Sequence, residues 1–182
     1  MATMNDLRCL TRPLVCCWIS CLPLALAAQA PRTSGEIPEA TAQGVVTELY
    51  DLVTFDAGAT PDWDKVRSLF LDEAIIILRT TRTESTQFTL EGFVQDFVNF
   101  IERDNVEQTG FVEEIIRMES MAFRDIAHVL VLYEAHIPGR DRPPTQGVDS
   151  FQLIKKDGRW WIVSITNDIP NPDNPVPAEL RR

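Results

Sequence analysis

The spacing of hydrophobic residues predicts three helices in the first half of the chain. Apolar residues recur every three or four positions, which is the period of an amphipathic helix. Asp62 or Asp64 can cap the second helix and Thr89 the third, because their side-chain oxygens accept hydrogen bonds from backbone N–H groups. The three predicted helices cover residues 42–55, 62–71 and 89–101.

After Gly110 the hydrophobic period changes to two, which is typical of β-strands. Residues 112–123 and 126–137 predict two long strands joined by a turn. Residues 146–168 predict a closing hairpin around Asp157-Gly158, because glycine and, less easily, aspartate adopt the positive φ of a tight turn. We expect these strands to form an antiparallel sheet.

The remaining segments complete a plan with one α+β domain. Residues 74–78 predict a short apolar strand, and residues 79–87 a loop or a weak edge strand. Helices grouped on one face of an antiparallel sheet are typical of the α+β class. The domain is expected over residues 42–168, between a flexible lead-in at 31–41 and an extended, proline-rich tail at 169–182.

Residues 1–30 have the pattern of a secretory signal peptide. Two arginines precede an apolar stretch, residues 14–26, which is too short for a comfortable membrane span. Cleavage is expected after Ala27 or Ala30, with export to the periplasm or the outside and no stable membrane insertion afterwards. An uncleaved apolar anchor and a true start at Met4 are the alternatives.

Cysteine placement and net charge exclude several classes of site in the processed chain. All four cysteines lie within residues 9–21, so the processed chain would have no disulfide, thiolate nucleophile or cysteine zinc site. The 182 residues carry a formal net charge of -10. This charge argues against nucleic acid as a partner, because phosphate backbones are bound by clustered Lys and Arg.

Three segments carry a resemblance to a known superfamily. They are residues 45–53, residues 62–74 and residues 156–164, the last reading Lys-Asp-Gly-Arg-Trp-Trp-Ile-Val-Ser. Over roughly residues 41–168 the chain resembles the nuclear-transport-factor-2-like (NTF2-like) superfamily, in particular its SnoaL-like and DUF4440-like members. The resemblance implies a cone-shaped, curved antiparallel sheet, also called cystatin-like, packed on three N-terminal helices. It also implies a pocket between these two layers.

The resemblance implies which side chains face this pocket, because alternate residues of a strand share one face. We expect an apolar, aromatic chamber with a few polar groups, the usual composition of a small-molecule site. The expected lining residues are Tyr50, Trp63, Phe97, Val131, Tyr133, Asp149, Phe151, Trp161, Ile165 and Asn167.

Two polar residues of the expected pocket are the only catalytic candidates. Tyr50 falls where the steroid-isomerase branch places an oxyanion-binding tyrosine, and Asp149 where that branch places a protonated acid. The position of the general base falls near Leu78, in an apolar run, so proton abstraction of that type has no agent. The alternatives are that Tyr50 only packs on its helix and that Asp149 pairs with an arginine or a backbone amide.

Other charged residues indicate neither a metal site nor a cofactor. His128 and His136 share one predicted strand and lie about 26 Å apart by strand rise, too far to bind one metal ion. Glu113, Arg117 and Glu119 have the same parity and predict an ion-pair face. We find no glycine-rich phosphate loop, serine nucleophile elbow or metal-spaced motif, and expect no cofactor and no metal.

The convex face of the sheet is expected to be apolar and to form a homodimer interface. The residues expected in this strip are Leu130, Leu132, Val148, Ile154, Trp160 and Ile162. The expected function is the binding of a small apolar or amphipathic molecule in the cone. The alternatives are a SnoaL-like lyase or isomerase using Asp149 and Tyr50, with Asn167 as a further member, and a dimeric scaffold acting through the convex face and the tail.

Overall fold

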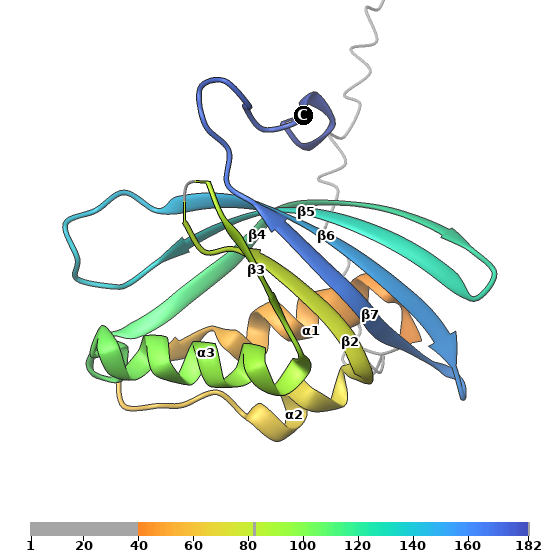
Figure 1. Ribbon diagram of the computed structural model, residues 1–182, viewed down its shortest axis with the longest axis horizontal. Helices are drawn as coiled ribbons and strands as arrows, with labels where there is room; N and C mark the ends of the chain where they lie inside the picture. Colours follow the sequence, from red (N-terminus) through yellow and green to blue (C-terminus); the bar gives the residue numbers. More distant parts are fainter. Residues whose placement is uncertain (1–39, 82, 182) are drawn as a thin grey trace, which may run out of the picture. The chain divides into compact units, whose positions relative to one another are not determined.

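A computed structural model describes residues 40–81 and 83–181 of the chain (Figure 1). Within these residues, three helices lie on one side of a seven-stranded sheet and the C-terminal segment lies on the other. The expected signal peptide and all four cysteines fall outside the described residues. None of the helices in the described part combines the length and the hydropathy that crossing a membrane requires.

The three helices form where the apolar spacing predicts them, with slightly different ends. They are α1 (Ala42–Val53), α2 (Trp63–Ser68) and α3 (Leu90–Arg103), and a short 3-10 helix, η2 (Val106–Gln108), follows α3. The side chains of Thr41, Asp62 and Thr89 each accept a hydrogen bond from a backbone N–H of the first turn. The apolar faces of α1 and α3 pack against the sheet and form the main core with it.

The four strands after Gly110 pair antiparallel, as expected, and the fold is α+β; one parallel pair elsewhere makes the whole sheet mixed. Its order is β1-β4-β5-β6-β7-β2-β3, and β2 pairs with β7 in parallel while every other pair is antiparallel. The relative direction of β2 and β7 depends on the path of the chain between them, so it cannot be predicted from the sequence pattern of either strand. The strands are β1 (Phe55–Asp56), β2 (Phe70–Arg79), β3 (Ser85–Phe88), β4 (Gly110–Phe123), β5 (Ile126–His136), β6 (Thr145–Lys156) and β7 (Arg159–Asp168).

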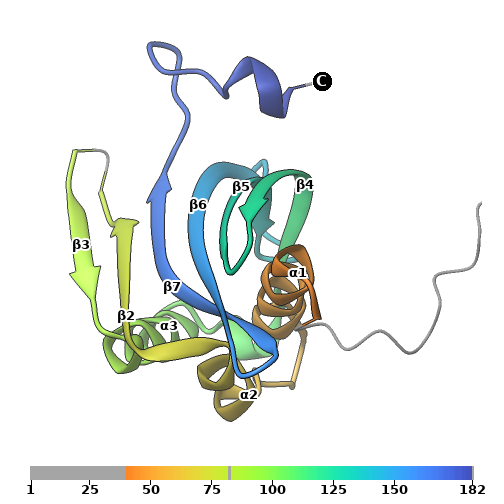
Figure 2. The same cartoon turned by 90° about the vertical axis from the view of Figure 1, so that its right-hand side faces the viewer.

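A β-bulge in β4 changes which of its residues face the helices. Ile115 pairs with Tyr133 of β5 but Arg117 pairs with Leu132, so Ile116 is the extra residue. Odd-numbered residues before the bulge and even-numbered residues after it therefore face the helices. Bulges also increase the local twist and bend of a strand, and Figure 2 shows the sheet curling over α1 and α3.

A second bulge, in β7, has the same effect on the closing hairpin. Gln152 of β6 pairs with Ser164, but Leu153 pairs with Ile162, so Val163 is the extra residue. The hairpin turn itself forms as predicted, with positive φ at Asp157 (54°) and Gly158 (82°).

The bulge in β7 overturns the expected orientation of three residues. Trp160 and Ile162 are 7% and 0% exposed and belong to the core, so they are not part of an outer apolar strip. Trp161 faces the other way. Its ring lies 3.9 Å from the guanidinium carbon of Arg159, and its indole N–H donates to the carbonyl of Lys156. The expectation that Trp161 lines the pocket is therefore wrong.

The C-terminal tail covers part of the outer face of the sheet. Its described residues form no strand, and it ends in a short 3-10 helix, η3 (Ala178–Leu180), beside β4. Val176 and Leu180 are buried and form a small second cluster on this face. The sheet residues of that cluster are Leu130, Leu132 and Val148, so half of the expected dimer strip contacts the chain's own tail.

The bulge predicts opposite sensitivities for two adjacent tryptophans. Replacing the buried Trp160 with alanine leaves a cavity in the core and should lower the free energy of unfolding by about 3–5 kcal/mol. Trp161→Ala removes a half-buried ring from the outer face and should cost about 1 kcal/mol. Urea unfolding of the two variants measures both values, and a larger loss for Trp161→Ala would contradict the observed register.

Candidate functional site

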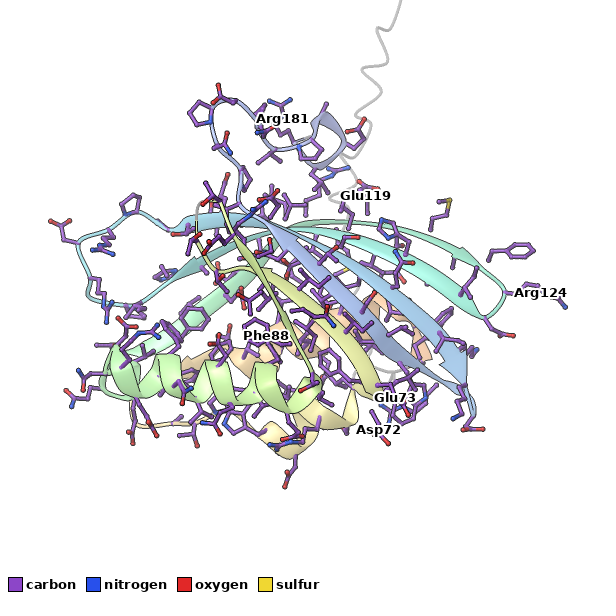
Figure 3. The ribbon with its side chains drawn as sticks, viewed as in Figure 1. Asp72, Glu73, Phe88, Glu119, Arg124 and Arg181 are labelled. Atoms are coloured by element: carbon purple, nitrogen blue, oxygen red, sulfur yellow. The ribbon has the colours of Figure 1, made fainter. Side chains whose placement is uncertain are left out.

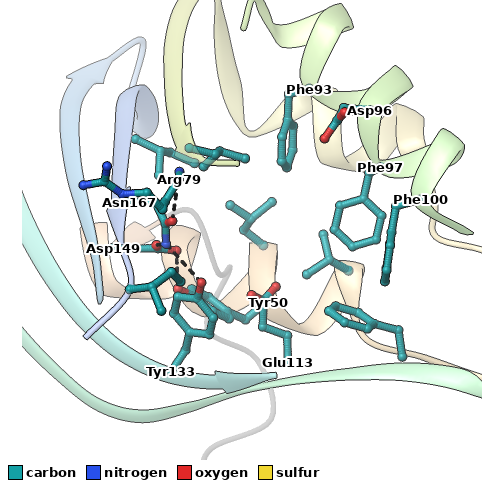
Figure 4. Close-up of a pocket in the computed structure, with 16 residues that line it drawn as sticks. Tyr50, Arg79, Phe93, Asp96, Phe97, Phe100, Glu113, Tyr133, Asp149 and Asn167 are labelled. Carbon is teal, nitrogen blue, oxygen red and sulfur yellow. Dashed lines mark hydrogen bonds between the residues drawn. The ribbon is translucent and has the colours of Figure 1, made fainter. Parts of the chain in front are cut away.

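A cavity of about 260 Å³ lies between the concave face of the sheet and helices α1 and α3 (Figure 4). It is slightly smaller than most small-molecule sites, which span roughly 300–1,000 Å³. Apolar and aromatic residues form most of its wall, and polar groups gather at one end. The described lining residues are Leu49, Tyr50, Val53, Leu78, Arg79, Phe93, Asp96, Phe97, Phe100, Phe111, Glu113, Tyr133, Asp149, Ile165, Asn167 and Ile169.

Aromatic rings from α3 and β4 form the apolar end of the cavity. The side chains of Phe93, Phe97 and Phe100 project from successive turns of α3, because residues three or four apart share one helix face. The ring of Phe111 in β4 meets those of Phe97 and Phe100 edge to face, with centroids 5.6 Å and 5.5 Å apart. These edge contacts fix the rings against one another.

The polar end of the cavity is a hydrogen-bonded cluster centred on Asn167. The backbone N–H of Arg79 donates to its Oδ1 at 3.2 Å, which fixes the orientation of the amide. Its Nδ2 then donates to Asp149 Oδ1 at 2.7 Å and to the hydroxyl of Tyr133 at 3.0 Å. Tyr50 donates its hydroxyl proton to the other carboxylate oxygen of Asp149 at 2.7 Å. Residues from α1, β2, β5, β6 and β7 therefore meet in one cluster.

The hydroxyl of Tyr133 is only partly used in this cluster. Its oxygen accepts from Asn167, and its proton has no acceptor among the described residues. Its ring lies directly over Gly147, where a Cβ atom would come within 2.2 Å of it. Only glycine at this position of β6 leaves room for the ring, so Gly147 fixes where the hydroxyl points.

Asp149 is buried in the cavity wall, and two opposing effects act on its acidity. Removal from water raises the pKa of the carboxyl to about 6, although the hydrogen bonds from Asn167 and Tyr50 favour the ionised form. Burial, and then the nearby charge of Asp149, raise the pKa of the Tyr50 hydroxyl well above its usual value. Tyr50 therefore stays a neutral donor, and Asp149 is mostly ionised at pH 7.

Glu113 brings a second carboxyl to the cavity, and its oxygens have no hydrogen-bond or ion-pair partner among the described residues. Burial, followed by the charge of Asp149, raises the pKa of Glu113 to about 8, so it is mostly protonated at pH 7. Its backbone is held in place on both sides, because Thr54 exchanges hydrogen bonds with the backbone N–H and carbonyl of Glu113. The carboxyl itself remains open to the cavity.

No basic group of the described lining points into the cavity. Arg79 is the only basic residue in that lining, and its guanidinium makes two hydrogen bonds to Asp168, at 3.0 Å and 2.9 Å. Asp96 of α3 lies at the exposed rim. The interior therefore holds carboxyl groups without a protein counter-ion.

Six of the ten predicted lining residues surround the cavity, and four do not. Tyr50, Phe97, Tyr133, Asp149, Ile165 and Asn167 line it. Val131 and Phe151 face the same side of the sheet but are completely buried in the core, and Trp63 packs on Phe97 at a centroid distance of 5.4 Å. Trp161 faces away, as the register of β7 requires. Leu78 lies in the wall and is apolar, as predicted.

The sequence analysis misassigned Glu113. It grouped Glu113 with Arg117 and Glu119, but the bulge at Ile116 places Glu113 on the opposite face from that ion pair. The adjacent pair Ile115-Ile116 interrupts the polar–apolar alternation, and this was the available signal of a bulge.

The described residues contain no group of three or more His, Cys, Asp or Glu side chains placed to hold a metal ion. His128, on the outer face, shares a hydrogen bond with Gln152 through its Nδ1 atom at 2.8 Å. The cavity chemistry therefore consists of hydroxyl, amide and carboxyl groups.

The raised pKa of Glu113 predicts an unusual dependence of stability on pH. An unfolded glutamate loses its proton near pH 4, whereas folded Glu113 keeps it up to about pH 8, so its contribution to stability falls as the pH rises between these values. Glu113→Gln should therefore raise the free energy of unfolding at pH 8 by about 4–5 kcal/mol and leave it nearly unchanged at pH 4.

Urea unfolding at several pH values measures this difference. Glu114→Gln is the matched control, because Glu114 is the next residue of β4 and is exposed on the other face. Parallel pH profiles for Glu113→Gln and the unmodified chain would contradict the assigned protonation state.

Comparison with known proteins gives similarity in structure only. No protein-family model matches the sequence, and no curated protein is significantly similar to it. An NTF2-like protein of unknown function from Pseudomonas putida KT2440 has a TM-score of 0.58 and 11% identity, over 72% of this chain and 86% of that one. An NTF2-like protein with a cystatin-like fold from Novosphingobium aromaticivorans has a TM-score of 0.56 and 10% identity, over 75% and 82%.

A third solved structure, described as a candidate scytalone dehydratase from Novosphingobium aromaticivorans, has a TM-score of 0.54 and 11% identity, over 71% of this chain and 81% of that one. At these identities the likeness establishes the fold and nothing further. The fold that the resemblance in the sequence implied is thereby confirmed. This chain has the NTF2-like, cystatin-like fold.

Proposed function

We propose that the cavity binds a small, largely apolar molecule with one polar end. The observation that carries this proposal is the pair of unused polar groups, the hydroxyl proton of Tyr133 and the carboxyl of Glu113, in an otherwise aromatic chamber. Apolar walls with a few convergent polar groups are the usual composition of a small-molecule site. The walls supply affinity through burial, and the polar end orients the ligand.

The charges of the cavity limit the class of ligand. Asp149 is mostly ionised at pH 7, and the guanidinium of Arg79 pairs with Asp168 instead of entering the cavity. A carboxylate or phosphate ligand would lose its water and meet a like charge without a compensating cation. Uncharged and cationic molecules remain as ligands.

We also propose export and self-association, on the sequence pattern and the surface. Secretion of a reporter fused to residues 1–30 tests export.

A homodimer would have to form through other residues than the expected apolar strip. Most residues of that strip are covered by the chain's own tail or buried in the core. Met121, Phe123 and Ile126 are 73%, 70% and 59% exposed near the tip of the β4–β5 hairpin, close to Arg124 (Figure 3), and sedimentation of the mature chain tests their role.

Filling the cavity should abolish ligand binding. Leu78→Trp places a larger side chain in the cavity wall and should weaken the binding of indole or phenethyl alcohol at least about tenfold. Ile75→Trp is the matched control, because Ile75 lies on the same strand and is 46% exposed. Calorimetric titration measures both affinities, and equal binding by the two variants would show that the ligand sits elsewhere.

A second candidate function is a lyase or isomerase, and Glu113 is the observation that favours it. The sequence lacked a general base near Leu78, but Glu113 brings a carboxyl to the same cavity from another strand. Two carboxyls whose environments separate their pKa values are a frequent arrangement of acid and base. One structure with this fold is described as a candidate scytalone dehydratase, but that likeness extends to the fold alone.

Deuterium exchange of β-tetralone tests this second candidate. Above about pH 8 Glu113 is mostly ionised and can remove the proton next to the carbonyl. The protein should then accelerate the exchange of this proton with heavy water, and Glu113→Gln should slow the exchange by about 100-fold. Proton NMR follows the exchange directly, with Glu114→Gln as the control. Exchange at the rate of buffer alone would remove proton abstraction from the possible activities.

A further inference from the structure

The carboxyl groups of the cavity lack a counter-ion, and this imbalance indicates the charge of the ligand. Glu113 and Asp149 face the interior, while the only basic residue of the described lining directs its guanidinium to Asp168. Buried charges in proteins are normally paired or hydrogen-bonded. Asp149 accepts hydrogen bonds from Tyr50 and Asn167, but Glu113 has no partner among the described residues.

The aromatic lining favours the same sign of charge. Six aromatic residues surround the cavity, and the faces of such rings attract cations electrostatically. An apolar neutral ligand would interact with these rings only through hydrophobic contact. A cation with an apolar body would place its charge at the carboxyls, near Tyr50 and Tyr133, and its body against the phenylalanine rings. The aromatic lining residues are Tyr50, Phe93, Phe97, Phe100, Phe111 and Tyr133.

We infer that the ligand is a small apolar amine, bound as its ammonium ion with the nitrogen at the Glu113 carboxylate and the hydrocarbon body against the phenylalanine rings. The inference rests on the proposed binding function and names the class of its ligand. The ammonium donates to Glu113 and to the phenolic oxygen of Tyr133, which accepts one hydrogen bond from Asn167 and has a second lone pair. Among the described residues of the cavity, no side chain brings a positive charge to these two groups, so the ligand would supply it.

Ammonium binding requires Glu113 to ionise. The groups around it are Tyr50 from α1, Tyr133 from β5 and Asp149 from β6, and none of them carries a positive charge. Free Glu113 holds a proton up to about pH 8, so binding below that pH releases this proton to the solvent. Amine affinity should therefore rise about tenfold per pH unit up to about pH 8 and then level off.

Three probes with the same aromatic body separate the possible ligand classes. Phenethylamine, phenethyl alcohol and phenylacetate differ chiefly in the charge of their polar end. Calorimetric titration of the mature chain at pH 7 should give an affinity for the amine at least about tenfold above that for the alcohol, with no binding of the acid. Repeating the amine titration in buffers of different ionisation enthalpy should show the release of a proton.

Two variants on one strand assign the effect to Glu113. Glu113→Gln should lower the affinity for phenethylamine at least about tenfold, remove its pH dependence and leave the alcohol unaffected. Glu114→Gln, on the outer face of β4, should change none of these quantities. Because each variant is also titrated with phenethyl alcohol, loss of folding is distinguished from loss of the ammonium contact.

The results also separate this inference from the proposed function. Equal affinities for the amine and the alcohol, or an amine affinity unchanged by Glu113→Gln, would overturn the amine inference while the binding function stands. Failure of all three probes to bind at concentrations up to their solubility would overturn the inference together with the proposed function.

Discussion

Two breaks in strand register decide which side chains the concave face of the sheet presents. The extra residue Ile116 places Glu113 in the cavity and leaves Arg117 outside. The extra residue Val163 places Asn167 in the cavity while Trp160 stays in the core. Both breaks also bend the strands around the helices. Without them, residues on one side of each break would turn to the other face of the sheet, and Glu113 and Asn167 would not share the concave face with the rest of their strands.

The polar end of the cavity is stable because almost every group in it has a partner. The amide oxygen of Asn167 accepts from one backbone N–H, and its amide nitrogen donates to two side chains. Both N–H groups of that amide therefore have an acceptor. A partly satisfied polar network in an apolar surrounding is costly. Glu113 is the exception, and its raised pKa shows that the folded chain relieves the cost by keeping the carboxyl protonated. The unpartnered carboxyl of Glu113 therefore lowers the stability of the fold at pH values where an unfolded glutamate is ionised.

Features that depend on neighbouring residues could be predicted from the sequence, and features that depend on strand pairing could not. The caps at Asp62 and Thr89 and the turn at Asp157-Gly158 follow from local chemistry and were predicted. The parallel pairing of β2 with β7 and the two bulges arise when distant segments meet. The sequence thus placed six lining residues correctly but assigned Glu113 and Trp161 to the wrong faces.

Gly147 shapes the cavity wall because it has no Cβ atom. The ring of Tyr133 occupies the space where any other residue would carry its Cβ, so the ring lies flat against the backbone of β6. A methyl group there would force the end of the Tyr133 ring out of its present position. The wall of the cavity at this end is therefore set by the backbone itself, the least deformable part of the protein.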